Sequence, residues 1–195
     1  MYEKIPALKE IYDRFEEAAN ELKQDQACTK GCSFCCRAAD STDITTLEGL
    51  RIRQAMEKMP KSRQKTLTKA FRKEIKKRES NEFSPCPFLM KTNACMIYEV
   101  RPFSCRRIYS VHVCSTENPP AVSQKVMELA AKTLHVLQQL DKTGYSGHMS
   151  YILYMLSVPA FLDTYLKGEF KPEEIMEFGK SHKIVINRMM GAKLT

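Results

Sequence analysis

Apolar residues recur along this chain every three or four positions, which places them on one face of an α-helix. Residues 5–26 carry the first such stripe, made of Ile5, Leu8, Tyr12, Phe15, Ala19 and Leu22. Residues 122–140 carry a second, made of Val122, Val126, Leu129, Thr133, Val136 and Leu140. A narrower stripe in residues 62–79 consists of Leu67, Phe71 and Ile75. Each stripe predicts an amphipathic helix with one face against a core.

Local signals add the boundaries of further helices. Thr45 and Glu48 fit a capping box, so a helix is expected to begin there and to end at Pro60. It would turn Leu47, Leu50, Ala55 and Met56 inward. Tyr151–Leu166 and Pro172–Gly179 also have helical patterns. Because no stretch alternates convincingly between apolar and polar residues, no strand is predicted.

The segment 84–118 has a different composition. It contains Pro85, Pro87, Pro102 and four widely spaced cysteines, without helical periodicity. An irregular segment of this length is unusual in a compact domain unless metal–ligand bonds replace the missing core. We therefore predict an all-α fold, an irregular helical domain built around a cysteine-rich metal-binding loop region. Residues 1–195 form one domain, with a cysteine module at 28–114 and packing helices in 1–27 and 115–195.

Length and composition narrow the class of protein. A chain of 195 residues can bury about 70% of its unfolded surface without disulfides. Eight cysteines are too few for a disulfide scaffold. The first residues, Met1–Pro6, are charged and lack the apolar stretch of a secretory signal. We expect a cytoplasmic protein whose thiols stay reduced.

No membrane span is expected. The segment between Lys142 and Asp163 has no charged residue and approaches the length of a bilayer span. It nevertheless contains several serines and glycines and is interrupted by Pro159. A buried helix explains it better.

The positive charge is local. Of the net charge of +8, residues 51–80 carry 12 Lys/Arg against 3 Asp/Glu, and the remainder is close to neutral. A basic helix at 61–78 could contact nucleic acid or another anionic partner. A solvated helix face is the simpler interpretation. The sequence does not indicate an oligomeric state.

The cysteines fall into two groups. The first is Cys28, Cys32, Cys35 and Cys36, and the second is Cys86, Cys95, Cys105 and Cys114. Packed free cysteines, disulfides, a dithiol redox centre at Cys32-x2-Cys35 and a metal site are the alternatives. Clustering in a chain without a secretory signal favours metal.

Neighbouring residues refine this metal hypothesis. Arg101, Arg106 and Arg107 flank Cys105 and are expected to lower its pKa. Cys35 and Cys36 are adjacent, so in an extended segment their side chains would point apart and serve different roles. His112 is a further candidate ligand, with an ordinary surface role as the alternative.

Two motifs carry a resemblance to a known family. Cys28-Thr29-Lys30-Gly31-Cys32-Ser33-Phe34-Cys35-Cys36 is the first. Cys86-Pro87-Phe88-Leu89, followed by Cys95-Met96-Ile97-Tyr98-Glu99-Val100-Arg101-Pro102-Phe103-Ser104-Cys105-Arg106, is the second. Together they resemble the YkgJ-type cysteine-cluster family, also called the CxxCxxCC or zinc- or iron-chelating domain. The first gap has three residues where the family's name describes two, and Ala94 replaces a frequent glycine.

The resemblance implies a metal-chelating module. Its ligands would come from Cys28, Cys32, Cys35, Cys36, Cys86, Cys95 and Cys105, with Cys114 a candidate that recurs in part of the family. The family also includes flagellin lysine methylases, whose similar region holds an iron–sulfur cluster. Those proteins are longer, so their activity is not carried over, and whether this chain is an enzyme stays open.

Spacing bears on the identity of the metal. Structural zinc sites usually take two Cys-x2–4-Cys pairs, and only the first group offers one. A compact triplet with one distant cysteine is the pattern of an iron–sulfur cluster, such as a 4Fe-4S centre. We therefore favour iron–sulfur over zinc. A redox or group-transfer enzyme and a metal-stabilised nucleic-acid or protein-binding module are the alternative functions.

Overall fold

The computed structural model describes residues 1–22, 27–29, 31–38, 41–169 and 171–190. Its helices are η1 Tyr2–Lys4, α1 Ile5–Leu22, α2 Phe34–Ala38, α3 Thr46–Glu57, α4 Lys61–Glu79, η2 Tyr98–Val100, α5 Phe103–Arg106, α6 Gln124–Leu140, α7 Met149–Ser157, α8 Pro159–Lys167, η3 Pro172–Ile175, α9 Met176–Ser181 and α10 Asn187–Met190. Its strands are β1 Asp43–Thr45, β2 Tyr145–His148 and β3 Val185–Ile186. Helices dominate, so the predicted fold class is confirmed.

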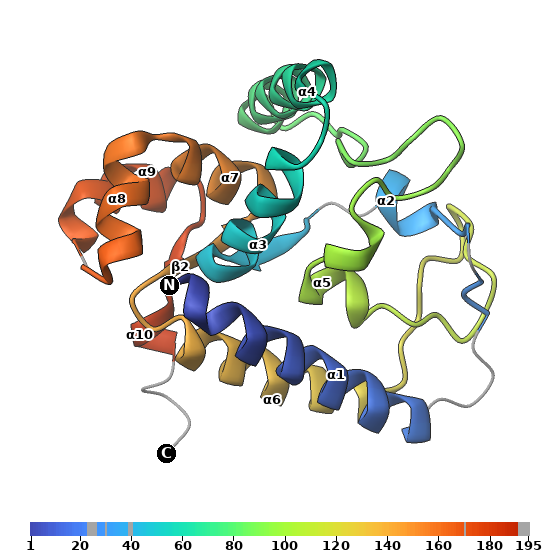
Figure 1. Ribbon diagram of the computed structural model, residues 1–195. Coiled ribbons are helices and arrows are strands. Elements are labelled where there is room, and N and C mark those ends of the chain that lie inside the picture. Colours follow the sequence, from blue (N-terminus) through green and yellow to red (C-terminus); the bar gives the residue numbers. More distant parts are fainter. Residues whose placement is uncertain (23–26, 30, 39–40, 170, 191–195) are drawn as a thin grey trace.

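Helices α1 and α6 lie side by side and form one layer (Figure 1). Between them lies an apolar cluster that includes Tyr12 and Phe15 of α1 and Val126 and Leu137 of α6. Phe103 of α5 joins this cluster and stacks edge-on against Phe15 with ring centroids 4.8 Å apart. The same cluster therefore anchors the short helix that carries Cys105.

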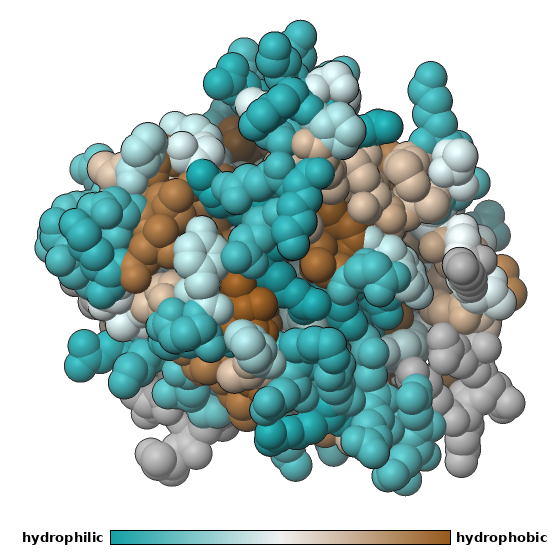
Figure 2. All heavy atoms as spheres, viewed as in Figure 1, coloured by the Kyte–Doolittle hydropathy of each residue, from teal (hydrophilic) through white to brown (hydrophobic). Residues whose placement is uncertain are grey.

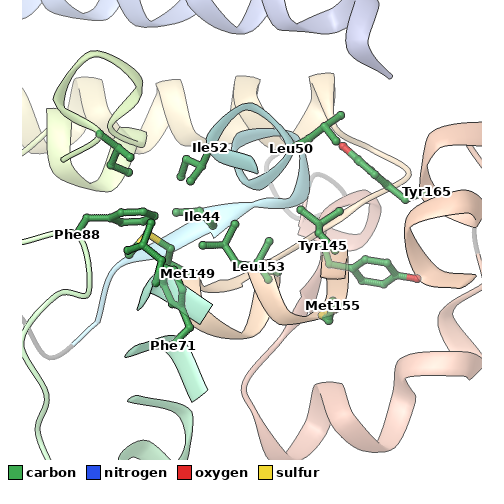
Figure 3. Packing of buried hydrophobic residues seen from close by; sticks show 14 residues of the cluster. Ile44, Leu50, Ile52, Phe71, Phe88, Tyr145, Met149, Leu153, Met155 and Tyr165 are labelled. Carbon is green, nitrogen blue, oxygen red and sulfur yellow. The ribbon is translucent and has the colours of Figure 1, made fainter. Parts of the chain in front are cut away.

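A second apolar cluster lies between α3, α4 and α7. Figure 3 shows Ile52, Ile44, Met149 and Phe71 converging on one another, with Phe88 from the loop after α4 beside them. Gly49 allows α3 and α7 to approach closely, because a Cβ there would come within 2.8 Å of a Leu156 methyl carbon. This core joins the helical body to the loop that follows Cys86.

The long helices follow their apolar stripes closely. Thr45 and Glu48 form the capping box in both directions, and α3 begins at Thr46 as predicted. The last four residues of the predicted first helix, 23–26, lie outside the described residues. The stripe of α6 is rotated slightly from prediction, because Leu137 is buried where Val136, 48% exposed, was expected.

Two features differ from prediction. The expected helix at 151–166 is two helices, since the chain turns at Val158 and α8 starts at Pro159, which has no N–H to continue the α7 ladder. A small antiparallel sheet of order β1-β2-β3 is also present, with Ile44 opposite Gly147 and Tyr145 opposite Ile186. The strands have two to four residues, and all four residues of β2 are buried, so no alternation marks them in the sequence.

Two buried carboxylates tie the helices together. Asp141, at the end of α6, accepts hydrogen bonds from Thr46 Oγ1 at 2.7 Å, Leu47 N at 2.9 Å and Tyr165 Oη at 2.7 Å. Glu74 of α4 accepts a hydrogen bond from Ser150 Oγ and pairs with Arg78 Nε at 3.4 Å. The Asp141 carboxylate lies at the N-terminus of α3, where the positive end of the helix dipole stabilises its negative charge.

None of the helices within the described residues is long and apolar enough to cross a bilayer. The uncharged stretch noted in the sequence forms β2, α7 and the first half of α8.

Candidate metal centre

The cysteines gather at one end of the molecule, away from α7, α8 and α9. In Figure 1 this end, at the right, consists of α2, α5 and the long loops before and after α5. Seven of the eight cysteines are partly buried and Cys32 is exposed. No disulfide joins any two of these eight residues, all of which the structure describes.

The first cysteines lie in a tight turn. Cys32 N donates to Thr29 O at 3.0 Å, and Gly31 has φ of 93°, a conformation that favours glycine. Cys28 Sγ accepts a hydrogen bond from Ser110 N at 3.3 Å, and Ala27 N donates to Ser110 O. Buried Ser110 thus holds this turn against the loop that carries Cys114.

Cys35 and Cys36 lie in the short helix α2 rather than in an extended segment. The expectation that their side chains point apart is therefore wrong, because the two thiols hydrogen-bond to each other. This hydrogen bond lowers the pKa of Cys35 below the ordinary thiol value and raises that of Cys36. The first proton therefore leaves the pair easily, from Cys35, and the second is held tightly on Cys36.

The loop after α4 folds back onto α2. Cys86 N donates to Cys36 O at 2.8 Å, which joins the first cysteine group to the second. An antiparallel bridge pairs Leu89 with Cys95, and Met96 N donates to Phe88 O at 2.9 Å. The loop therefore returns Cys95 to the neighbourhood of Cys86.

Helix α5 places Cys105 through a set of buried polar contacts. Glu48 Oε1 accepts a hydrogen bond from Phe103 N at 2.7 Å, while its other oxygen closes the capping box at Thr45. Arg106 donates to Glu16 Oε1 at 2.6 Å and lies over the Tyr12 ring. These contacts hold α5 against α1 and α3.

Cys35 and Cys36 of α2 both interact with thiols of the second sequence group. Burial raises the pKa of each of four other cysteines, and repulsion from Cys35 adds to the rise in all of them: Cys28, Cys86, Cys95 and Cys105. Cys36 also lies within reach of the charges of Cys86 and Cys105. The structure thus brings five other thiols into the electrostatic environment of Cys35, whereas Cys114 interacts with Cys28 and donates to His112 O.

The arginines do not act as the sequence suggested. Burial, followed by repulsion from neighbouring thiols, raises the pKa of Cys105, so the expected lowering by Arg101, Arg106 and Arg107 is wrong. Arg106 forms a salt bridge with Glu16, and Arg107 is exposed to solvent. Arg101 does lower the pKa of Cys95, although burial outweighs it.

Backbone amides point at several of the sulfurs. Phe88 N donates to Cys86, Ile97 N donates to Cys95, and each bond opposes the effect of burial on the thiol pKa. Together with Ser110 N at Cys28, these are the donors that stabilise a thiolate. Burial raises the pKa of Cys86 to about 12, so a metal must displace protons to bind there.

The donor chemistry fits a thiophilic metal, but the side chains are not assembled around one point. Within the described residues, no three His, Cys, Asp or Glu side chains are grouped closely enough to hold a metal ion. The sulfurs therefore have to converge further to form a site. The sulfur-only donors and the amide donors aimed at them suit zinc or an iron–sulfur cluster.

Sequence reasoning missed the residues that hold this end together. His112 Nε2 faces Pro119 O at 2.9 Å, which does not favour the ligand role. Ser110 and Glu48 matter instead, yet a serine and a glutamate carry no chemical signature of such contacts in the sequence. The capping box did single out Glu48, although not its second partner on α5.

Comparison with known proteins bears on the same region. The family model described as "CxxCxxCC: Putative zinc- or iron-chelating domain" matches residues 27–134, more than half of the chain. No curated protein and no solved structure matches.

Proposed function

The chain belongs to the CxxCxxCC family, and from this premise we propose that it binds an iron–sulfur cluster through thiolates centred on Cys35. The observation that carries this proposal is that α2, which contains Cys35 and Cys36, lies against the loop of the second cysteine group, where Cys86 N donates to Cys36 O at 2.8 Å. Structural zinc sites usually take two Cys-x2–4-Cys pairs, and only the first group of cysteines contains such a pair, so the spacing favours a cluster. The iron–sulfur assignment extends the family's zinc- or iron-chelating description.

The ligand set we propose is Cys35, Cys86, Cys95 and Cys105. Each of the last three is partly buried, and the charge of Cys35 contributes to raising its thiol pKa. Cys86 and Cys95 also receive backbone N–H donors, which would remain bonded to a metal-bound thiolate. Cys28, Cys32, Cys36 and Cys114 remain candidates for a second set of ligands or for partners of the first.

Anaerobic purification followed by metal analysis and a visible spectrum tests the proposal. Stoichiometric iron and sulfide, with a broad absorbance near the violet end of the visible range, is the expected result. A colourless protein with stoichiometric zinc would replace the cluster with a zinc site. Protein that lacks both metals after anaerobic purification, and that takes up neither on reconstitution, would contradict metal chelation itself.

A second candidate function is redox or group-transfer chemistry at the centre. It is favoured by one observation, the exposure of the Cys32 side chain beside an otherwise partly buried set of thiols. Catalytic metal sites keep an accessible position, whereas structural sites are closed. A change in the visible spectrum of the metal-loaded protein on addition of cyanide or a small thiol, without loss of metal, supports an open position, and a spectrum unchanged by these ligands contradicts it.

A further inference from the structure

A groove lies between α4 and the loop that carries Cys86 and Cys95. It encloses about 390 Å³ and is lined from the helix side by Leu67 and Ala70 and from the loop side by Leu89, Met90 and Met96. Apart from Leu67, these residues are only half-buried, so their apolar atoms face the groove and solvent. Methionine side chains are flexible and suit surfaces that adapt to a bound partner.

Cations border the groove on both sides. Arg63 lines it from α4 and Lys91 from the loop, and both residues are exposed. Lys69 and Lys73 follow the groove residues Thr66 and Ala70 by three positions, so they border the same face of α4. Within the part of the chain that the structure describes, none of these four cations pairs with an acidic side chain.

The surface agrees with this arrangement. Figure 2 shows hydrophilic side chains over α4 at the top of the molecule, with less polar spheres beside them toward the cysteine end. Helix α4 lies at the edge of the molecule and packs inward mainly through Leu67, Phe71 and Glu74. Its basic side is therefore open to a partner.

Three properties restrict what the groove can bind. The cations from Arg63 to Lys73 extend along about 15 Å of helix, which is longer than a small metabolite but suits a polymer. If α4 were only a solvated helix face, its charges would be explained, but the apolar residues that line the groove between Arg63 and Lys91 would not. None of the described residues that line the groove is aromatic, whereas single-stranded nucleic acid is usually held by bases stacked on aromatic side chains.

We propose that this groove binds a polypeptide segment in which apolar side chains are flanked by Asp and Glu. The apolar side chains would enter between Leu67, Ala70 and Met90, and the acidic residues would pair with Arg63 and Lys91 at the rims. Charge complementarity of this kind supports specificity and fast association. The occupied groove would contact Leu89, which is bridged to Cys95, and Met96, whose N–H donates to Phe88 O, so the partner would sit directly against the candidate metal loop.

Selection of peptides on the full-length protein tests the proposal. A random dodecapeptide display library is panned against the purified protein and, separately, against the charge-reversed variant R63E/K91E. Recovered peptides are then synthesised with a fluorophore, and their affinities are measured by anisotropy. We expect peptides enriched in Asp and Glu next to apolar residues, with at least about tenfold weaker binding to R63E/K91E.

Matched variants separate the groove from general charge. K125E/K132E makes the same change of net charge on exposed positions of α6, on the opposite side of the molecule from α4 in Figure 1, and should leave affinity unchanged. Met90→Gln keeps side-chain length, removes apolar surface and should weaken binding several-fold. Circular dichroism checks that each variant is folded, and metal content should not change because neither Arg63 nor Lys91 is a candidate ligand.

Several results would overturn the proposal. These are recovery of no peptides, recovery of peptides without acidic residues, or equal loss of affinity in K125E/K132E and R63E/K91E. Tight binding of a 20-nucleotide oligodeoxythymidylate that is lost in R63E/K91E, without any selected peptide, would assign the same surface to nucleic acid. If the wild-type protein contains no metal but still binds the selected peptides, the proposed metal-binding function is wrong while the proposal that the groove binds peptides stands.

Discussion

The helical body and the cysteine end of this molecule are held together in different ways. In the body, the first turn of α3 is buried throughout, and Tyr12, Phe15 and Leu137 are each at most 2% exposed. Between Arg107 and Ala121, by contrast, Ser110 is the buried residue, and Val111 and Val113 are 44% and 82% exposed. The body buries its own apolar side chains, whereas residues 107–121 bury almost none. The buried apolar residues elsewhere in the cysteine end, Phe88, Ile97 and Phe103, pack into the two clusters of the body.

This contrast indicates where a metal would act on stability. A segment that buries little apolar surface cannot offset the entropy of ordering its backbone. Structural zinc contributes about 10–16 kcal/mol in small peptides, which is enough to order loops of this kind. The body is expected to fold without metal and the cysteine end to depend on it.

The largest effect is expected from Cys35→Ser. Because Cys35 lies in α2, which the bond from Cys86 N to Cys36 O joins to the second cysteine group, its loss should weaken metal binding by at least about 100-fold. Cys114→Ser is the matched control and should lose much less, since Cys114 interacts with Cys28 rather than with the central set. Metal content after dialysis against a competing chelator measures both. If Cys35→Ser and Cys114→Ser lose the same amount of metal, Cys35 is no more important for metal binding than Cys114.

The next effect is expected from Phe88→Ala at the junction of the two regions. Phe88 is fully buried and packs edge-on against Phe71 with ring centroids 5.2 Å apart. Its removal should lower the free energy of unfolding by about 3–5 kcal/mol, measured by urea denaturation. Phe83→Ala is the control, because Phe83 is 46% exposed and should change stability by less than about 0.5 kcal/mol. A small loss in Phe88→Ala would mean that the body does not support the loop.

Asp141 provides a pH-dependent test confined to the body. Burial raises its pKa from 3.8 to about 6, despite the hydrogen bonds from Thr46, Tyr165 and Leu47 N. A carboxyl group with a raised pKa binds a proton more tightly when folded, so its favourable contribution is fully present below pH ~4 and is lost as pH rises to ~6. Relative to Asp141→Asn, the wild type should lose on the order of 3 kcal/mol of unfolding free energy between pH 4 and 7.

Urea denaturation of both proteins at several pH values measures this difference. The comparison with Asp141→Asn cancels other titrating groups, including His148, whose pKa burial lowers to about 3 and which acts in the opposite direction. A difference that is constant across the range, or that grows in favour of the wild type, would contradict the raised pKa.

The smallest effect is expected from Thr45→Ala. Thr45 Oγ1 accepts a hydrogen bond from Glu48 N at 3.2 Å, and the loss of such a cap costs about 1 kcal/mol. Ser123→Ala removes the corresponding cap of α6 and should cost a similar amount. Only Thr45→Ala should also raise the alkylation rate of Cys105, because Glu48 holds Phe103 N of α5. An equal rise in the Cys105 alkylation rate in both variants would mean that Glu48 does not hold α5 in place.

The helices could be predicted because their apolar stripes are long and regular. α1 and α6 each repeat a buried position over several turns, so local pattern and tertiary burial agree, while the start of α3 was located by its capping box. The strands of two to four residues could not be predicted, since they are too short to show alternation. Buried Asp141 and Glu74 also escaped prediction, because a charged residue is buried only where partners distant in sequence meet it.

The candidate site was predicted in composition but not in arrangement. The two motifs identified the family, which the comparison confirms, and the assignment of the eight cysteines as ligands stays a prediction. The central place of Cys35 depends on α2 and on the bond from Cys86 N to Cys36 O, which spacing does not reveal. The sequence suggested Arg106 as a counterion for Cys105, but its guanidinium forms a salt bridge with Glu16 of α1.

Hydrogen exchange of the metal-loaded and chelated protein tests the central claim most directly. On removal of metal, we expect amides in 84–118 and α2 to lose protection, while amides of α1, α6, α3 and α7 keep theirs. Ser110 N and Cys86 N, which bond across the two cysteine groups, should be among the most affected. Equal loss of protection in both regions, or no loss in either, would contradict the division into a self-supporting body and a metal-dependent cysteine end.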